Sequence, residues 1–380
     1  MGAAAVTSTL VDNVKARRWR AFDLQLFLYV TLLIGFGVVM GYSAGFTEAG
    51  SGAGVSQSVK TLIWTTIGMI IFFVAASIDY HWLQTLTVPI YAAVLAMLTL
   101  TMLIGTNLFG AQMSITVAGL DFQFSEVSKV LMIVVLASFL ASRREKIGKL
   151  STLVGAGLLM AIPTFLVFKQ PDLGTALVFV AILVGMLFMS GASIGWMALL
   201  TGATVAAAPL VVQSLQEYQR ARLFCFLDPS ADPQGACYQL VQALNAVGSG
   251  GLFGQGLTAG RQNQLGFLPV QSTDFIFTVV AEELGFIGSL VLLAIFALLI
   301  WRILAIGWGA RDMLGMMVAM GLASMLLFQI MVNVGMVIGI MPVTGIPLPF
   351  VTYGGSSMIS LLFGMGILQS VRMHALKPTF

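Results

Sequence analysis

Charged residues are scarce in this chain of 380 residues, where Asp, Glu, Lys and Arg together make up only 9%. A soluble domain carries about 25% of them, so a soluble globular protein is excluded. Hydrophobic residues make up 58% of the chain, and the mean hydropathy is +0.98. We therefore expect an all-α protein that crosses a membrane many times.

Histidine is equally scarce. His81 and His374 are the only two, and both fall near segments expected in the cytoplasm, which excludes a histidine metal cluster and a Ser-His-Asp triad. The glycines of 248–256 lack the Lys-Ser/Thr of a P-loop and follow no expected strand, so ATP use is not expected. No metal site is predicted, and assistance from a divalent cation such as Mg²⁺ or Mn²⁺ stays open.

The only two cysteines, Cys225 and Cys237, both lie in a segment expected outside the membrane. That compartment permits a disulfide. The alternative is two unpaired small residues near the membrane surface, and the sequence does not decide between them.

Apolar runs long enough to cross a bilayer predict about ten transmembrane helices. They leave no soluble catalytic domain, so residues 1–380 are expected to form one transmembrane domain. Residues 1–22 form a tail before the first run, which has no cleavage site and is expected to remain as an anchor. The runs are 24–43, 60–78, 83–104, 125–141, 150–168, 174–191, 195–212, 275–301, 314–337 and 354–371.

The basic residues predict the orientation, because cytoplasmic segments of membrane proteins are enriched in Lys and Arg. An inside N-terminus places twelve of the 18 basic residues in the cytoplasm, and the long segment 213–273 outside. The net charge of +3 reflects this bias, so no nucleic-acid partner is expected. The twelve are Lys15, Arg17, Arg18, Arg20, Arg143, Arg144, Lys146, Lys149, Arg302, Arg311, Arg372 and Lys377.

Asp274 is the most informative polar residue. It ends the outer segment 213–273 directly before an apolar run, where water, headgroups and a helix end meet. A membrane enzyme acting on a lipid-linked substrate needs its base at such a place. As an alternative or additional role, Asp274 would cap the helix, and the helix dipole would favour its charged form.

Other carboxylates interrupt the apolar runs. Glu126 and Lys129 share one helix face, either as an ion pair that only fixes packing or as a pair lining a polar cavity. Asp172 either caps the next helix or contributes to a site. Of the adjacent Glu282 and Glu283, at most one is expected to face the same cavity as Asp274.

The Pro/Gly-rich segment 345–357 precedes the last apolar run. Irregular backbone near membrane depth survives only where it is buried in protein or lines a cavity. We therefore expect this segment to shape the outer cavity.

These segments together resemble the SEDS family (shape, elongation, division and sporulation), which includes RodA and FtsW, and the resemblance runs along nearly the whole chain. The matching segments are FQFSEVSK (122–129), KQPDLGTALVF (169–179), FLDPSADPQGACYQLVQALNAVGSGGLFGQG (226–256), FLPVQSTDFIFTVVAEELGFIG (267–288) and MPVTGIPLPFVTYGGSS (341–357).

The resemblance implies ten transmembrane helices with a large outer loop between the seventh and eighth, in the cytoplasmic membrane. It implies a glycosyltransferase that polymerises lipid II into the glycan strands of peptidoglycan. The family's essential loop aspartate falls on Asp274, and the substrate-binding positions are expected at Glu126, Lys129, Asp172, Arg220, Arg222 and Ser356. A lipid II flippase and a non-catalytic scaffold for a penicillin-binding protein are the alternatives.

The expected partners are lipid II, the growing glycan strand, membrane lipids and a class B penicillin-binding protein, because new glycan must be crosslinked. Small residues of the eighth and ninth helices would allow such a partner to approach closely. They are Gly285, Gly288, Ser289, Gly315, Gly321 and Ala323. A role in elongation, division or sporulation is not distinguished.

Overall fold

The computed structural model describes residues 19–46, 53–108, 111–117, 120–265 and 273–375. Most of the expected cytoplasmic tail and residues 266–272 of the expected outer loop, including the Gln271-Ser272 part of its last motif, lie outside the described residues.

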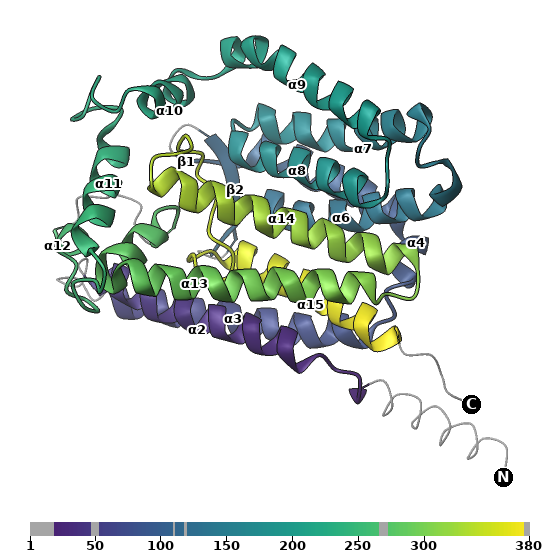
Figure 1. The fold of residues 1–380 in the computed structure, drawn as a ribbon, viewed down its shortest axis with the longest axis horizontal. Coiled ribbons are helices and arrows are strands. Elements are labelled where there is room, and N and C mark those ends of the chain that lie inside the picture. The colour runs from purple at the N-terminus through teal and green to yellow at the C-terminus, as the bar shows by residue number, and fades with distance from the viewer. Residues whose placement is uncertain (1–18, 47–52, 109–110, 118–119, 266–272, 376–380) are drawn as a thin grey trace.

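A long helix occupies each of the ten predicted ranges (Figure 1). They are α2 (Leu24–Phe46), α3 (Ala53–Ser77), α5 (Thr87–Ile104), α6 (Phe124–Ser142), α7 (Leu150–Lys169), α8 (Leu173–Met189), α9 (Ile194–Ser214), α13 (Ile276–Trp308), α14 (Met313–Val337) and α15 (Gly355–His374). Within the described residues, seven of them are long and apolar enough to cross a membrane: α2, α3, α5, α6, α7, α13 and α14. The expected polytopic membrane protein is confirmed.

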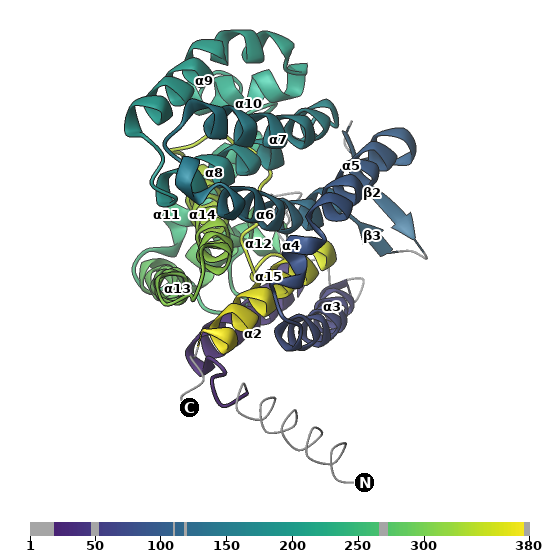
Figure 2. The same ribbon diagram turned by 90° about the vertical axis from the view of Figure 1, so that its right-hand side faces the viewer.

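Helices α6 and α14 form the centre of the bundle. Most of their side chains are buried, and α14 packs against α13, α8 and α6. The outer helices turn large apolar side chains away from the protein, as Leu103 (73% exposed) and Trp301 (67% exposed) illustrate. Lipid is the solvent for such faces. Helix α9 lies at the edge of the bundle, as Figure 2 shows.

The two ends of the bundle differ. The start of α2 and the end of α15 lie at the same end of the bundle in Figure 1, as an even number of crossings requires. Near that end the buried Asp23 carboxylate accepts hydrogen bonds from the Arg302 guanidinium and lies 3.6 Å from Arg372. The short helix α4 (Trp82–Thr85) and the 3-10 turn η2 (Arg144–Lys146) belong to the connections here. His81 contacts Asp79 and Asp312.

The opposite end carries the segment between α9 and α13 (Figure 1). It folds into the helices α10 (Glu217–Leu227), α11 (Tyr238–Gly250) and α12 (Arg261–Gln264). Cys225 and Cys237 form a disulfide, which joins the end of α10 to the start of α11. The structure thus decides between the two alternatives that the sequence left open.

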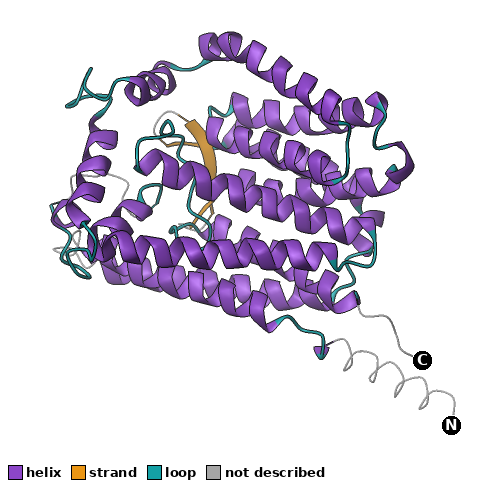
Figure 3. Ribbon diagram, in the orientation of Figure 1, coloured by secondary structure: helices purple, strands orange, loops and turns teal. Residues whose placement is uncertain are grey.

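Three short strands add an element that the sequence analysis did not predict. They are β1 (Thr106–Leu108), β2 (Ala111–Val117) and β3 (Leu120–Phe122), which pair antiparallel in the order β1-β2-β3. Figure 3 shows the sheet as a small element beside the helices. Pairing satisfies backbone groups of the α5–α6 connection that no helix accommodates.

The apolar run 275–301 predicted one continuous helix, but α13 is broken at Gly285. Gly285 has φ +68° and ψ −164°, a conformation essentially reserved for glycine. A Cβ at this position would lie 2.3 Å from the backbone nitrogen of Gly254. The break therefore needs glycine both for its backbone angles and for the close approach of the outer loop.

The small residues proposed as contact points for a partner serve packing inside the bundle instead. Gly285, Gly315, Gly321 and Ala323 are buried, and a Cβ on Gly321 would meet Ile133 and Met186. Small residues let helices approach closely, but here both helices belong to the same chain. The prediction that these residues contact a partner was wrong for the buried ones.

Candidate active site

The buried ion pair of α6 forms one wall of the site. Lys129 donates from Nζ to Oε1 of Glu126 at 2.6 Å, and the two residues are 2% and 4% exposed. They lie three positions apart in the first turns of α6, so they share one face. The hydroxyl of Ser360, on α15, donates to the carbonyl of Glu126 and so fixes α6 against α15.

Asp172 lies at the start of α8 and caps it, as one of the two sequence interpretations proposed. Its carboxylate accepts from the backbone N–H of Thr175 at 2.9 Å, while Oδ2 lies 3.5 Å from the side-chain amide of Gln123. The backbone N–H of Gln123 in turn donates to the hydroxyl of Ser356 at 2.9 Å. Gln123 therefore connects the starts of α6, α8 and α15.

Asp274 lies two residues before α13, and its role as a helix cap is wrong. The N-cap position belongs to Phe275, and no side chain caps this helix. Among the described residues, none donates a hydrogen bond to the Asp274 carboxylate, and the residue is partly exposed. The helix end therefore leaves the carboxylate available for chemistry.

The backbone around Asp274 is held firmly although its carboxylate is not. The side-chain amide of Asn333 donates to the carbonyls of Asp274 and Ile346 at 2.9 and 2.8 Å. The hydroxyl of Thr352 donates to the carbonyl of Thr273 at 3.2 Å. These bonds join the start of α13 to the loop between α14 and α15.

Glycine at 345 brings that loop against Asp274. Gly345 has φ +73°, and a Cβ there would lie 3.3 Å from Oδ2 of Asp274. A Cβ on Gly174, in the first turn of α8, would lie 2.7 Å from the carbonyl oxygen of Thr344. The Pro/Gly-rich segment therefore lies against the carboxylate of Asp274 and against the first turn of α8.

The two loop arginines have different surroundings. The guanidinium of Arg222 lies 5.7 Å from the ring of Tyr218, whose hydroxyl donates to the carbonyl of Pro171 beside Asp172. Arg220 instead donates to the carbonyls of Val212 and Gln213, at the end of α9. The structure brings Arg222 toward the acidic residues and uses Arg220 to close a helix end.

The charges of Arg222, Asp172 and Glu126 all act on the carboxyl group of Asp274. Burial raises the pKa of Asp274 to about 6, the Arg222 charge lowers that pKa, and the charges of Asp172 and Glu126 raise it. Burial also raises the pKa of Asp172, which the Thr175 N–H and the Lys129 charge oppose. A carboxyl group with a pKa near neutrality is suited to take a proton.

Glu282 and Glu283 belong to a different structure. Glu282 accepts from the backbone N–H groups of Gln262 and Asn263 at 2.7 and 3.2 Å. Glu283 accepts from the hydroxyl of Ser43 and the amide of Asn263. Both carboxylates hold the outer loop, which is compatible with the expectation that at most one of them faces the same cavity as Asp274.

Sequence reasoning did not single out Gln123 or Asn333 as residues of the site, and it included Gly345 and Thr352 only as part of the segment 345–357. Asn333 had a detectable signal, because a buried amide in an apolar helix requires partners. The others act through the backbone or through partners distant in the chain, which no local pattern reveals.

The described residues do not build a site for a metal ion by themselves, since they contain no group of three or more His, Cys, Asp or Glu side chains that could hold one.

The fold and the site define a polytopic membrane protein with a carboxylate, that of Asp274, beside the loop between α14 and α15. Residues 24–377 match the model of the FtsW/RodA/SpoVE family, described as cell cycle proteins. The chain belongs to this family.

Curated relatives support the match over almost the whole chain. Stage V sporulation protein E of Bacillus subtilis is 36% identical, over 93% of this chain and 97% of the relative. Peptidoglycan glycosyltransferase MrdB of Escherichia coli is 37% identical, over 93% of this chain and 96% of the relative.

Solved structures share the fold. The chain of RodA, the rod shape determining protein of Thermus thermophilus, has a TM-score of 0.71 and 28% identity, over 94% of this chain and 99% of that chain. A chain from work described as "Structural coordination of polymerization and crosslinking by a peptidoglycan synthase complex" has a TM-score of 0.78 and 30% identity, over 93% of this chain and 98% of that chain.

Proposed function

We propose that this protein is a peptidoglycan glycosyltransferase that polymerises lipid II at the outer face of the cytoplasmic membrane. The observation that carries the proposal is the unbonded carboxylate of Asp274, which lies beside Gly345 and shares its environment with Glu126, Asp172 and Arg222. Relatives named as peptidoglycan glycosyltransferases match 93% of this chain.

The carboxylate of Asp274 acts as the general base. It takes the proton from the 4-hydroxyl of the acceptor's N-acetylglucosamine as the oxygen attacks the anomeric carbon of the donor's N-acetylmuramic acid. The bond from that carbon to the pyrophosphate breaks, and undecaprenyl pyrophosphate leaves with the electron pair. Attack from the opposite face converts the α-linked donor into a β-1,4 linkage.

Positive charge near the site offsets the charge that develops on the leaving pyrophosphate. Lys129 supplies it from α6 and Arg222 from α10. The Lys129 ammonium is buried and already bonded to Glu126, so it is held in place before the substrate binds. Arg220 supports the reaction indirectly, because its guanidinium occupies the end of α9.

Asp172 and Ser356 shape the substrate-binding wall. Asp172 is held by Thr175 and Ser356 by Gln123, so both side chains have fixed positions at the starts of α8 and α15. We assign them to positioning the sugar groups of the substrate, together with Glu126.

A class B penicillin-binding protein is the proposed partner. The related chain described as part of a peptidoglycan synthase complex supports this proposal. Since Gly285, Gly315, Gly321 and Ala323 are buried, a transmembrane partner would contact exposed apolar side chains of these helices, such as Leu298 and Leu327. Co-expression with the cognate transpeptidase tests the proposal by whether a complex survives detergent and raises polymerase activity.

Reconstitution of the purified protein with lipid II tests the function itself. Glycan polymer in the wild type and none in Asp274→Asn supports a polymerase. Movement of lipid II across the bilayer without polymer would identify a flippase instead. The proposal would be contradicted if the protein neither formed polymer nor moved lipid II, whether or not the transpeptidase was present.

A further inference from the structure

The outer loop is inserted into the break of α13. The backbone N–H groups of Gln255 and Gly256 donate to the carbonyls of Glu282 and Glu283. In return the N–H groups of Phe286 and Ile287 donate to the carbonyls of Gly251 and Leu252. The break thus exchanges helical hydrogen bonds for four bonds to the loop, so these four N–H groups and four carbonyls are paired within the protein and not left to lipid.

The length of α13 places this break at the outer membrane surface. Residues 286–308 form about 35 Å of helix, which is sufficient by itself to cross a hydrocarbon core of about 30 Å. Gly285 therefore lies at the level of the outer headgroups. Leu252 (63% exposed) and Phe253 (79%) belong to the segment whose backbone bonds to Phe286 (61%) and Ile287, so exposed apolar residues of the loop continue the apolar surface of α13.

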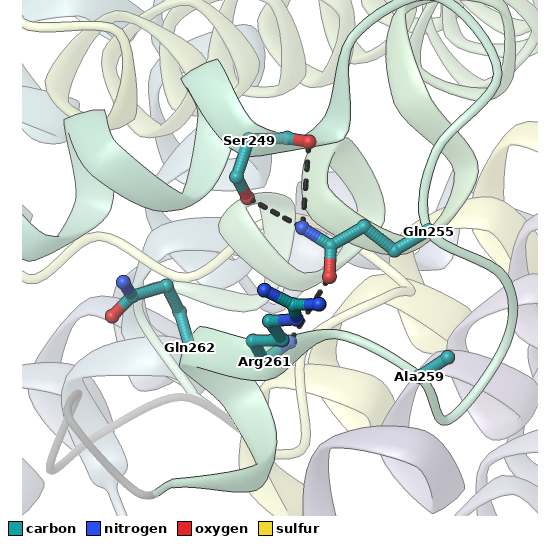
Figure 4. Close-up of a pocket in the computed structure, with 5 residues that line it drawn as sticks. All are labelled: Ser249, Gln255, Ala259, Arg261 and Gln262. Carbon is teal, nitrogen blue, oxygen red and sulfur yellow. Dashed lines mark hydrogen bonds between the residues drawn. The ribbon is translucent and has the colours of Figure 1, made fainter.

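A polar pocket of about 470 Å³ lies on this anchored loop, lined by Ser249, Gln255, Ala259, Arg261 and Gln262. Figure 4 shows the guanidinium of Arg261 between the side chains of Gln255 and Gln262. The Gln255 amide nitrogen lies 2.9 Å from the Ser249 hydroxyl, and the Gln255 amide oxygen accepts from the backbone N–H of Arg261 at 3.2 Å. These bonds fix the walls of the pocket.

Arg261 is a cation with its donors available. It is exposed, and among the described residues its guanidinium meets no hydrogen-bond acceptor or carboxylate. None of the residues that line the pocket is acidic. The nearby Glu282 is 1% exposed, and its carboxylate is occupied by the N–H groups of Gln262 and Asn263.

We propose that this pocket binds the phosphate group of an outer-leaflet lipid, with Arg261 as the principal donor. Guanidinium groups match phosphate oxygens with paired, charge-assisted hydrogen bonds. The pocket lies at headgroup depth beside apolar side chains, so a lipid can place its phosphate in the pocket and its chains against Leu252 and Phe253. The phosphate can belong to a membrane phospholipid or to a polyprenyl-linked molecule.

Lipid binding to the full-length protein in dodecyl maltoside, measured by native mass spectrometry, tests this proposal. Phosphatidylglycerol is compared with diacylglycerol of the same chains, and undecaprenyl phosphate with undecaprenol. We expect Arg261→Gln to weaken binding of a phosphate-bearing lipid about tenfold. Lys60→Gln, which removes an exposed cation outside the pocket, should leave binding unchanged.

The two phosphate lipids, added in competition, identify the source of the bound group. Arg261-dependent preference for phosphatidylglycerol assigns a phospholipid site, and preference for undecaprenyl phosphate assigns a site for the substrate's lipid. Equal binding by the wild type and Arg261→Gln, or equal binding of lipids with and without phosphate, would overturn the proposal. The measurement needs no turnover, so its outcome is independent of the proposed glycosyltransferase activity.

Discussion

Asn333 holds Asp274 by its backbone and not by its carboxylate. The side-chain amide donates to the Asp274 carbonyl at 2.9 Å, and the same nitrogen donates to the carbonyl of Ile346. The position of the residue is therefore fixed by α14 while the acid group stays available. A base that must accept and release a proton requires this combination.

Replacement of Asp274 by Asn should abolish polymerisation while the protein still folds. Asparagine keeps the size and the backbone contacts to Asn333 and Thr352, but it cannot take a proton. We expect at least a ~100-fold loss in polymer formation, the usual contribution of a general base. Glu217→Gln, which alters an exposed carboxylate in α10, is the control. If Asp274→Asn formed polymer at near wild-type yield, Asp274 would not be the general base.

The rate of polymerisation should depend on the pKa of Asp274. Burial raises that pKa to about 6, so the carboxyl group is protonated, and inactive as a base, below this pH. We expect kcat/KM to be constant above about pH 7 and to fall about tenfold per pH unit well below pH 6. A midpoint near 4, typical of an exposed aspartate, would contradict the role.

The same profile provides a test of Arg222. Its charge lowers the pKa of Asp274, so Arg222→Gln should move the midpoint above that of the wild type. Arg220→Gln is the matched control, because that guanidinium is bonded to the end of α9 and should leave the midpoint unchanged.

Removing one partner of the Glu126–Lys129 pair should destabilise the protein strongly. Each single change leaves a buried charge without its partner, at a cost of about 3–5 kcal/mol. The double variant Glu126→Gln with Lys129→Met should be more stable than either single variant, yet inactive. Thermal unfolding in detergent measures the first expectation and polymer yield the second. Normal polymerisation by the double variant would reduce the pair to a structural role.

Gly285→Ala should disrupt the junction between α13 and the outer loop. The left-handed backbone alone costs about 1–3 kcal/mol for a residue other than glycine, and the new Cβ would clash with the backbone of Gly254. Gly41→Ala is the control, since no atom lies within 4 Å of a Cβ at that position. Limited proteolysis of the outer loop compares the two variants. Equal protection of both would show that the break tolerates a side chain.

The helical runs were predictable because the membrane imposes their length and apolarity on the local sequence. The same holds for Glu126 and Lys129, whose spacing in one helix brings them together wherever the helix lies. Prediction failed where distant segments meet. The break at Gly285 depends on an inserted loop some thirty residues earlier, and the small sheet of 106–122 depends on pairing between short strands.

The sequence by itself determined that the chain is a membrane bundle, where its polar residues fall, and that Asp274 lies at the outer mouth, because each of these depends on local composition. Only the tertiary structure decided what those residues do. It leaves the carboxylate of Asp274 unbonded, places Arg222 near it and Arg220 elsewhere, and uses Glu282 and Glu283 as anchors for a loop. Hydrogen bonds and desolvation depend on which groups the fold brings together, and helices far apart in the chain supply them.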